Sequence, residues 1–414
     1  MALNYIWFFF FIIAFAIAFG KWVITGDPLI FKTVTEGIFK SANDSVDLSF
    51  KLIGIMTLFL GFMNIGEKAG AIRFLSKLVA PFFSKLFPEL PPKHPAYGHM
   101  MMNFSANLLG LDNAATPFGL KAMESLQTLN PSKETASNAQ IMFLVLHASG
   151  LTLIPISIIA MRASVTPPAA NPTDIFIPCM IATFAATVAA LTIVSIRQKI
   201  NLLQPVILAW IGGISLLIGL LIAYLKIFLS QVQIESFSTV LSNGLILLIF
   251  LVFLTGGIFK KVNVFEAFIE GAKGGFEIAI KIIPYLVAML VAISVLRTSG
   301  AFEFITDGMK TLFSFMGMDT QFVSALPTAM MKPLSGSGSR AMMVDTMTTY
   351  GADSFAGRLS AIFQGSSDTT FYVIAVYFGS VGIKNTRYSI PSMLLADLVG
   401  IVTAIFVAYL FFGN

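Results

Sequence analysis

The sequence predicts an all-α polytopic membrane protein built from two repeats that contain broken or re-entrant helices. Of the 414 residues, 56% are hydrophobic and 11% are charged, whereas soluble domains carry about 25% charged residues. The mean hydropathy is +0.84, and long apolar stretches recur along the chain with polar interruptions in the same order in both halves. This composition excludes a soluble enzyme, a disordered chain and a secreted disulfide scaffold.

The distribution of charges indicates which partners to expect, and the single cysteine excludes two kinds of cysteine site. The formal net charge is +5, but the basic residues form no long run. We therefore expect a lipid bilayer as the surrounding partner, and no nucleic acid. Cys179 is the one cysteine in the sequence, which excludes an intramolecular disulfide and a cysteine metal cage.

The first apolar stretch, Tyr5–Ile24, predicts a retained membrane helix. A signal peptide would begin with positive residues and end at a small-residue cleavage site. Here the first positive residue is Lys21, near the end of the apolar run. We expect a helix with its amino end outside, in a multi-pass protein of the inner (plasma) membrane.

Further apolar stretches predict the remaining membrane helices. A hydrocarbon core of about 30 Å needs about 20 helical residues, and the absence of water there requires backbone groups to pair within helices. Two stretches are short and must include flanking residues. The stretches are Leu48–Met63, Ala139–Ile159, Ile175–Val194, Val206–Phe228, Val240–Ile258, Ile278–Leu296, Thr370–Val381 and Ile390–Phe412, with amphipathic helices at Ala71–Leu86 and Ala301–Met316.

The order of features in the first half returns in the second half. In each half an apolar span is followed by a Gly-Ala pair, an amphipathic helix, two polar breaks and closing spans. Gly70–Ala71 corresponds to Gly300–Ala301, and His147–Thr152 corresponds to Gln364–Thr369. The predicted domains are a first repeat at 1–200, a linker pair of membrane helices at 201–262 and a second repeat at 263–414.

Paired interruptions of apolar segments are typical of transporter binding sites. A Gly-, Ser- or Asn-rich break unwinds a helix at membrane depth, and the freed backbone groups must line protein or water. The half-helix amino ends then present unpaired N–H groups and a positive dipole end. The alternative is that small residues only permit close helix packing.

The first break carries amides and a carboxylate at 103–117. Asp112 and Asn113 are good caps for a following half-helix, and Gly110 allows a reversal before them. Asn107 and Thr116 add polar groups that could face a cavity. A capped turn at the membrane interface is the alternative interpretation.

A Ser-Gly alternation forms the sharpest local signal. Ser335, Ser337 and Ser339 alternate with glycines and are followed by Arg340. We expect this stretch to break a helix and to offer backbone amides to an anion, with Ser339 capping the next half-helix. The alternative is that Lys332 and Arg340 reach out to lipid headgroups.

The last break places an acidic residue in an apolar run. Asp368 follows Gln364, Ser366 and Ser367 and precedes Thr369. An ionisable group inside the membrane costs roughly 2.5–3.5 kcal/mol and is a functional candidate by default. We therefore predict that Asp368 couples an ion, or else caps the following span.

His147 lies in the second break of the first repeat. It could relay protons or only bond a neighbouring backbone group.

Enzyme chemistry is not predicted. No His-Glu-x-x-His motif is present, so a zinc hydrolase is unsupported, and no histidine follows His147. An aspartyl pair that joins Asp345 with Asp368, or Asp112 with either, stays open as an alternative.

Two sets of motifs resemble known families. The run 107–124 is similar to the spore maturation protein A family, and the runs 331–343 and 364–379 are similar to the spore maturation protein B family. The resemblance covers nearly the whole chain and suggests a fusion of the two. Both families carry the nucleoside-recognition Gate domain, a label shared with concentrative nucleoside transporters, so the resemblance implies a fold of that type. It implies no particular substrate.

The sequence thus predicts a secondary transporter of a small polar or anionic solute. No cofactor and no metal site are expected, and the coupling ion is Na⁺ or H⁺, held by Asp368 and His147. A homo-oligomer is compatible with the sequence. A non-transporting structural or regulatory envelope protein is the main alternative. The predicted solute-binding residues are Asn107, Asp112, Asn113, Thr116, Ser335, Ser337, Ser339, Arg340, Gln364, Ser366, Ser367 and Thr369.

Overall fold

The computed structural model describes residues 2–91, 94–110 and 112–413, and most of these residues are helical. Within these ranges no β-strand forms, and one isolated parallel bridge joins Thr135 to Asn385. The helical fold confirms the fold class expected from the composition.

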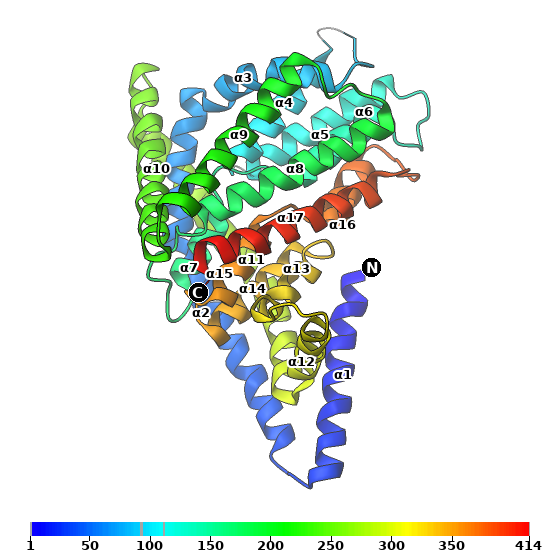
Figure 1. Cartoon of the computed structure of the whole chain (residues 1–414), viewed down its shortest axis with the longest axis vertical. Coiled ribbons are helices and arrows are strands. Elements are labelled where there is room, and N and C mark those ends of the chain that lie inside the picture. The colour runs from blue at the N-terminus through cyan, green and yellow to red at the C-terminus, as the bar shows by residue number, and fades with distance from the viewer. Residues whose placement is uncertain (1, 92–93, 111, 414) are drawn as a thin grey trace. The chain divides into compact units, whose positions relative to one another are not determined.

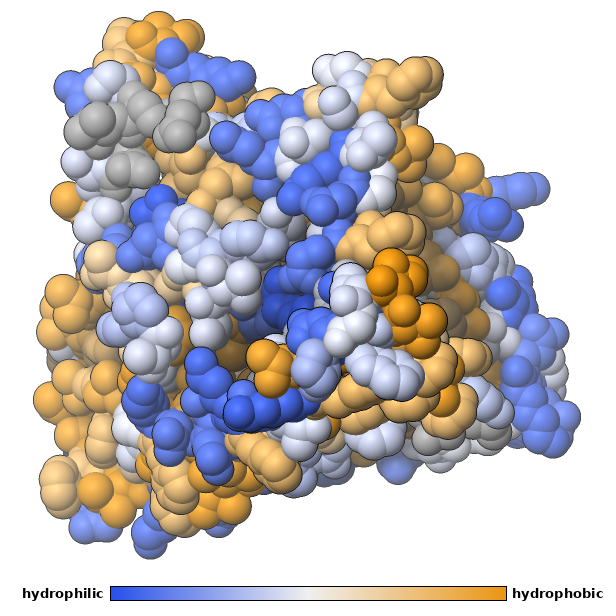
Figure 2. Space-filling view, turned by 90° about the horizontal axis from the view of Figure 1, so that it is seen from below, coloured by the Kyte–Doolittle hydropathy of each residue, from blue (hydrophilic) through white to orange (hydrophobic). Residues whose placement is uncertain are grey.

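Among the described residues, seven helices are long and apolar enough to cross a membrane. Wide apolar areas also face outward in Figure 2, as expected for a lipid-facing surface. The helix α2 has 40 residues, so it measures about 60 Å and exceeds the hydrocarbon core. These seven helices are α1 (Ala2–Thr25), α2 (Ile30–Ala69), α8 (Phe176–Gln198), α9 (Pro205–Phe228), α10 (Gln231–Phe259), α11 (Val264–Ser299) and α17 (Ser389–Phe412).

The shorter elements follow α2 and α11 in matching order (Figure 1). Ala139–Ile159 is not one span, as its apolar character suggested, because its break divides it into α6 and α7. The first set is α3 (Ala71–Leu86), α4 (Pro95–Leu108), α5 (Asp112–Leu129), α6 (Asn138–Ala148) and α7 (Ile156–Ser164). The second set is α12 (Ala301–Phe315), the 3₁₀ turn η1 (Gln321–Ala325), α13 (Leu326–Met331), α14 (Gly336–Tyr350), α15 (Phe355–Gly365), α16 (Thr370–Val373) and the π-turn η2 (Ile374–Phe378).

A glycine hinge opens each repeat at the predicted place. Gly70 (φ +93°) separates α2 from α3, and Gly300 (φ +83°) separates α11 from α12. A left-handed conformation is strained for residues with a side chain. The paired Gly-Ala signals therefore mark the same sharp turn in both halves.

The chain divides into two compact units, and each unit takes pieces of both repeats. Unit 1 comprises Met1–Leu58, Ser157–Pro172 and Ala272–Gln364, and unit 2 comprises Phe59–Ile156, Thr173–Gly271 and Gly365–Asn414. The chain changes unit next to the predicted breaks, after Ile156 and after Gln364. Residues 157–172 of the first repeat thus belong to the same unit as 272–364, and residues 365–414 of the second repeat belong to the same unit as 59–156.

Unit 2 is built on tightly packed helices. Small residues let α8 and α17 approach closely: a Cβ on Gly400 would lie 3.2 Å from Ala186 Cβ, which is the packing that membrane helices favour. Aromatic residues and methionines of α3 to α6, together with Tyr377 and Phe378, complete the core.

In unit 1, a buried arginine of α7 hydrogen-bonds a distant segment of the chain. Arg162 is 0% exposed and donates to the carbonyl of Ala352 at 2.7 Å and to Asp353 Oδ1 at 3.1 Å. Because a buried charge needs such partners, Arg162 joins α7 of the first repeat to the loop before α15.

Candidate functional site

Three of the four predicted breaks meet inside unit 2. The Leu153 amide donates to the Leu108 carbonyl at 2.8 Å, which joins the two breaks of the first repeat. The Asp368 amide donates to the Ala148 carbonyl at 2.8 Å, which joins the second of them to the last break of the second repeat. Backbone groups freed at the helix ends are thus paired both within the first repeat and between the two repeats, as apolar surroundings require.

Two glycines make this approach possible. Gly150 has φ +63°, and a Cβ there would lie 3.2 Å from the Asp368 amide nitrogen. Gly110 has φ +71°, and a Cβ there would lie 2.6 Å from the Ile154 carbonyl oxygen. Both positions combine a left-handed backbone with a close backbone neighbour, so glycine is favoured at each position for two separate reasons.

His147 stands at the centre of the polar groups that the breaks bring together. Its Nδ1 lies 2.7 Å from Asn107 Nδ2 and 3.0 Å from Asn103 Oδ1, two residues one turn apart on α4. Its Nε2 lies 3.9 Å from Asp368 Oδ2. The His147 side chain is 7% exposed and that of Asp368 is 48% exposed, so this His147 cluster has a buried and an open end.

Tyr377 completes the cluster and was not predicted. Its ring packs edge-on against His147 with centroids 4.8 Å apart, and its hydroxyl hydrogen-bonds the side chains of Thr116 and Asn103. The only sequence signal was a tyrosine within an apolar run, which is equally typical of a membrane interface.

The first break is shorter than the sequence suggested. Asn103, Ser105 and Asn107 belong to the helix α4, which ends at Leu108. Asn103 and Asn107 face His147, whereas Ser105 Oγ lies 3.2 Å from Ser76 Oγ. The side chains of Asp112 and Asn113, predicted to bind solute, lie outside the described residues.

The hydroxyls of the last break are buried in unit 2. Ser366, Ser367 and Thr369 are each at most 7% exposed. Thr370 donates to Asp397 Oδ2 at 2.6 Å, which gives that buried carboxylate a partner inside the protein.

The Ser-Gly stretch belongs to unit 1, and its geometry corrects one expectation. Ser335, not Ser339, is the cap of α14, because its Oγ accepts the Gly338 amide at 3.0 Å. The alternating glycines lie inside the helix. Ser339 is buried and donates to the Thr328 carbonyl at 2.8 Å, and Ser337 Oγ lies 3.2 Å from Ser335 Oγ.

Lys332 does not reach out to lipid headgroups. It is 6% exposed, and its Nζ donates to the Gln364 carbonyl at 2.6 Å. The Gln364 Oε1 atom is itself buried and has no hydrogen-bond partner among the residues that the structure describes. Since a buried acceptor costs free energy while it lacks a donor, Gln364 is a candidate contact for a donor group of a solute. Arg340, on the second turn of α14, is partly buried.

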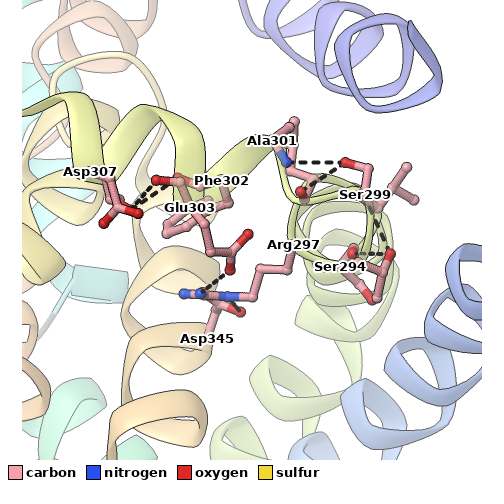
Figure 3. Close-up of polar contacts among 12 residues, drawn as sticks. Ser294, Arg297, Ser299, Ala301, Phe302, Glu303, Asp307 and Asp345 are labelled. Carbon is pink, nitrogen blue, oxygen red and sulfur yellow. Dashed lines mark hydrogen bonds and ion pairs between the residues drawn. The ribbon is translucent and has the colours of Figure 1, made fainter. Parts of the chain in front are cut away.

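An ion-pair cluster at the start of the second repeat was also missed. Arg297 at the end of α11 donates from Nε to Asp345 Oδ1 at 2.7 Å and from Nη2 to the same carboxylate, and Glu303 lies 3.5 Å from Nη1 (Figure 3). The guanidinium also sits 4.1 Å from the centre of the Phe302 ring. Arginine is suited to such bidentate, stacked sites.

Comparison with known proteins agrees with the predicted resemblance. The sequence profile of the Gate family, described as nucleoside recognition, matches residues 49–165 and 279–384. The chain is 48% identical over 174 residues to spore maturation protein B of Bacillus subtilis (strain 168), which spans 42% of this chain and 96% of that protein. It is 42% identical over 160 residues to spore maturation protein A of the same organism, which spans 39% of this chain and 81% of that protein. No solved structure matches the chain.

Proposed function

We propose that this chain, which belongs to the Gate family and joins counterparts of spore maturation proteins A and B, is a secondary transporter in the inner (plasma) membrane. The solute is small and polar or anionic. Transport is driven by an ion gradient, since the sequence holds no ATP-binding motif.

The observation that carries this proposal is the meeting of helix breaks from both repeats at the His147 cluster. Ionisable groups are costly at membrane depth and usually mark a solute or ion pathway. The cluster joins His147 of the first repeat to Asp368 of the second repeat, with Asn107 and Thr116 beside them. Broken helices at matching places in two repeats support the same interpretation.

The remaining predicted residues supply the groups that a polar solute needs. Hydroxyls come from Ser366, Ser367 and Thr369 in unit 2. Unit 1 separately offers Ser335, Ser337 and the positive Arg340 at the amino-terminal part of α14, and Gln364 near the end of α15 (Phe355–Gly365). A helix amino end and a cation both favour an anionic group.

Asp345 is a poor candidate for the catalytic pair of an aspartyl enzyme, which was the enzyme alternative. An aspartyl pair needs a carboxylate that can take up and release a proton. Both oxygens of Asp345 accept hydrogen bonds from Arg297, so this carboxylate is held as the partner of a cation.

The proposal is tested by a thermal-shift screen of the purified chain against a metabolite library, with and without Na⁺. We expect a polar or anionic solute to raise the melting temperature, and the rise to disappear in the Asp368→Asn and Arg340→Ala variants. Reconstituted vesicles then measure uptake of that solute. A chain that binds no solute and transports none in vesicles would instead be the non-transporting envelope protein.

A further inference from the structure

We propose that the coupling ion is a proton, and that His147 Nε2 and Asp368 Oδ2 share it. The inference rests on the proposed ion-driven function and deepens it, because the sequence left Na⁺ and H⁺ open. It depends on whether the oxygen or the nitrogen of the Asn103 and Asn107 side-chain amides faces the His147 imidazole.

The orientation of the Asn103 amide is fixed by a backbone carbonyl. Asn103 Nδ2 lies 2.7 Å from the Ala115 carbonyl oxygen. A carbonyl can only accept, so the nitrogen of the amide must face it. The other atom of the amide, Oδ1, therefore faces His147 Nδ1 at 3.0 Å. An oxygen acceptor at this distance requires that Nδ1 carries a hydrogen.

The Asn107 amide can adapt to this tautomer. Among the described residues, its side chain hydrogen-bonds His147 alone, at 2.7 Å. A half-turn of the amide presents its oxygen in place of its nitrogen at almost no steric change. Two amide oxygens then accept from Nδ1–H, and the tautomer of His147 is set from one side of the ring.

The opposite ring nitrogen then faces a carboxylate. With its hydrogen on Nδ1, a neutral imidazole presents a lone pair at Nε2, and Asp368 Oδ2 lies 3.9 Å away. A lone pair opposite an ionised carboxylate is repulsive. One proton resolves this conflict, either on Nε2 as imidazolium beside carboxylate, or on Asp368 as a carboxylic acid beside the neutral ring.

The separation also leaves the pair able to exchange its proton. A direct hydrogen bond needs about 2.7–3.2 Å, so at 3.9 Å the pair must close slightly or admit a water or a solute donor. The Asp368 end is half exposed, which gives a path for the proton. Among the described residues, Tyr377 is the other titratable residue in contact with His147. The two rings pack in a T-shaped arrangement with centroids 4.8 Å apart.

A sodium ion fits this pair poorly. Hard cations take oxygen ligands, whereas the atom of His147 that faces Asp368 Oδ2 is a nitrogen. A nitrogen lone pair beside a carboxylate is instead the usual arrangement for holding a proton.

The test is nitrogen NMR of the full chain in lipid nanodiscs with ¹⁵N-labelled histidine. The sequence has three histidines, so the His94→Asn and His99→Gln changes leave His147 as the one signal. Asparagine keeps the capping role of His94 on α4. We expect Nδ1 to carry a hydrogen at every pH and Nε2 to lose its proton as the pH rises, with no response to Na⁺.

The Asp368→Asn variant is compared with Asp397→Asn, which removes another carboxylate of unit 2. We expect Asp368→Asn to move the midpoint of Nε2 proton loss toward acid by about one pH unit, and Asp397→Asn to leave it unchanged. A bare Nδ1, equal effects of both variants, or a signal that follows Na⁺ would overturn the inference. These outcomes are read without any solute, so they are separate from failure of transport.

Discussion

His147 and Asp368 are the residues at which the proposed function can be tested most locally. If the pair couples ion and solute, Asp368→Asn should weaken ion-driven uptake by about tenfold or more, the equivalent of losing one charge-assisted hydrogen bond, about 1.5 kcal/mol. Uptake into proteoliposomes under an imposed pH gradient measures this. Asp397→Asn is the matched control, because Thr370 holds that carboxylate inside the protein. Equal uptake by wild type and Asp368→Asn would remove Asp368 from the mechanism.

Arg297 should matter for stability. Removing one partner of a largely buried pair leaves an uncompensated charge, so Arg297→Ala should destabilise the protein by about 3 kcal/mol. Chemical unfolding in detergent micelles measures it. Lys384→Ala serves as the control, since its pair with Glu134 is exposed and such pairs contribute about 1 kcal/mol or less. A smaller loss for Arg297→Ala than for Lys384→Ala would contradict this account.

For single residues, the sequence indicates which charged side chains are unusual more readily than it indicates what they contact. His147 and Asp368 stand out as ionisable residues in apolar runs, and the structure brings them together. Arg297 looks like an ordinary basic residue at a helix end, since its partner Asp345 is 48 residues away. The Ser-Gly pattern predicts Ser339 as the cap of the next half-helix, whereas the structure shows Ser335 in that role. Only the backbone shows which serine oxygen meets the Gly338 amide.

The helix breaks are the elements that bring the two repeats together. Gly150→Ala should disturb their contact, because a Cβ there would be strained by φ +63° and would press on the Asp368 amide. Gly382→Ala is the control, with φ +72° and open space around it. Both changes should cost about 1–2 kcal/mol for the left-handed backbone.

Gly150→Ala should in addition reduce uptake of the solute found in the screen, as measured in proteoliposomes. Equal uptake by the two alanine variants would show that the close approach of the breaks is not needed for function.

The elements were predictable to the extent that their signals are local. The matched Gly-Ala pairs correctly mark the hinges at Gly70 and Gly300, and the amphipathic helix Ala71–Leu86 has the bounds expected from its pattern. The polar run after Asn103 was taken as part of a break. Its amides instead remain helical, because their side chains find partners in His147 and Ala115. Tertiary hydrogen bonds of this kind leave no trace in local propensity.

The molecule as a whole is divided differently from its sequence. Repeat boundaries at 1–200 and 263–414 remain a prediction, whereas each compact unit draws on both halves. The links are long-range contacts, such as Arg162 to Ala352 and Arg387 to the Ala136 carbonyl. One sequence without an alignment contains no signal for such pairings.

Because each compact unit contains segments from both halves of the sequence, we can predict how the two halves behave when they are separated. The chain cut between Leu229 and Ser230, in the loop between α9 and α10, should yield fragments that co-purify when co-expressed, because neither contains a complete unit. Each expressed alone should aggregate, since its exposed core would lack its partner surface. Affinity purification through a tag on one fragment measures this. Two separately stable, monomeric fragments would contradict this prediction.

We expect the His147 cluster to form a water-accessible site at membrane depth, and labelling of Asp368→Cys by a membrane-impermeant thiol reagent measures this accessibility. The background is Cys179→Ser, and the controls are Leu217→Cys on an outward apolar position and Lys384→Cys on an exposed loop. We predict that Asp368→Cys reacts in intact vesicles, more slowly than Lys384→Cys, and is protected by the solute found in the screen, while Leu217→Cys stays unlabelled. A position 368 as inert as 217, or as reactive as 384 and unprotected, would contradict the account.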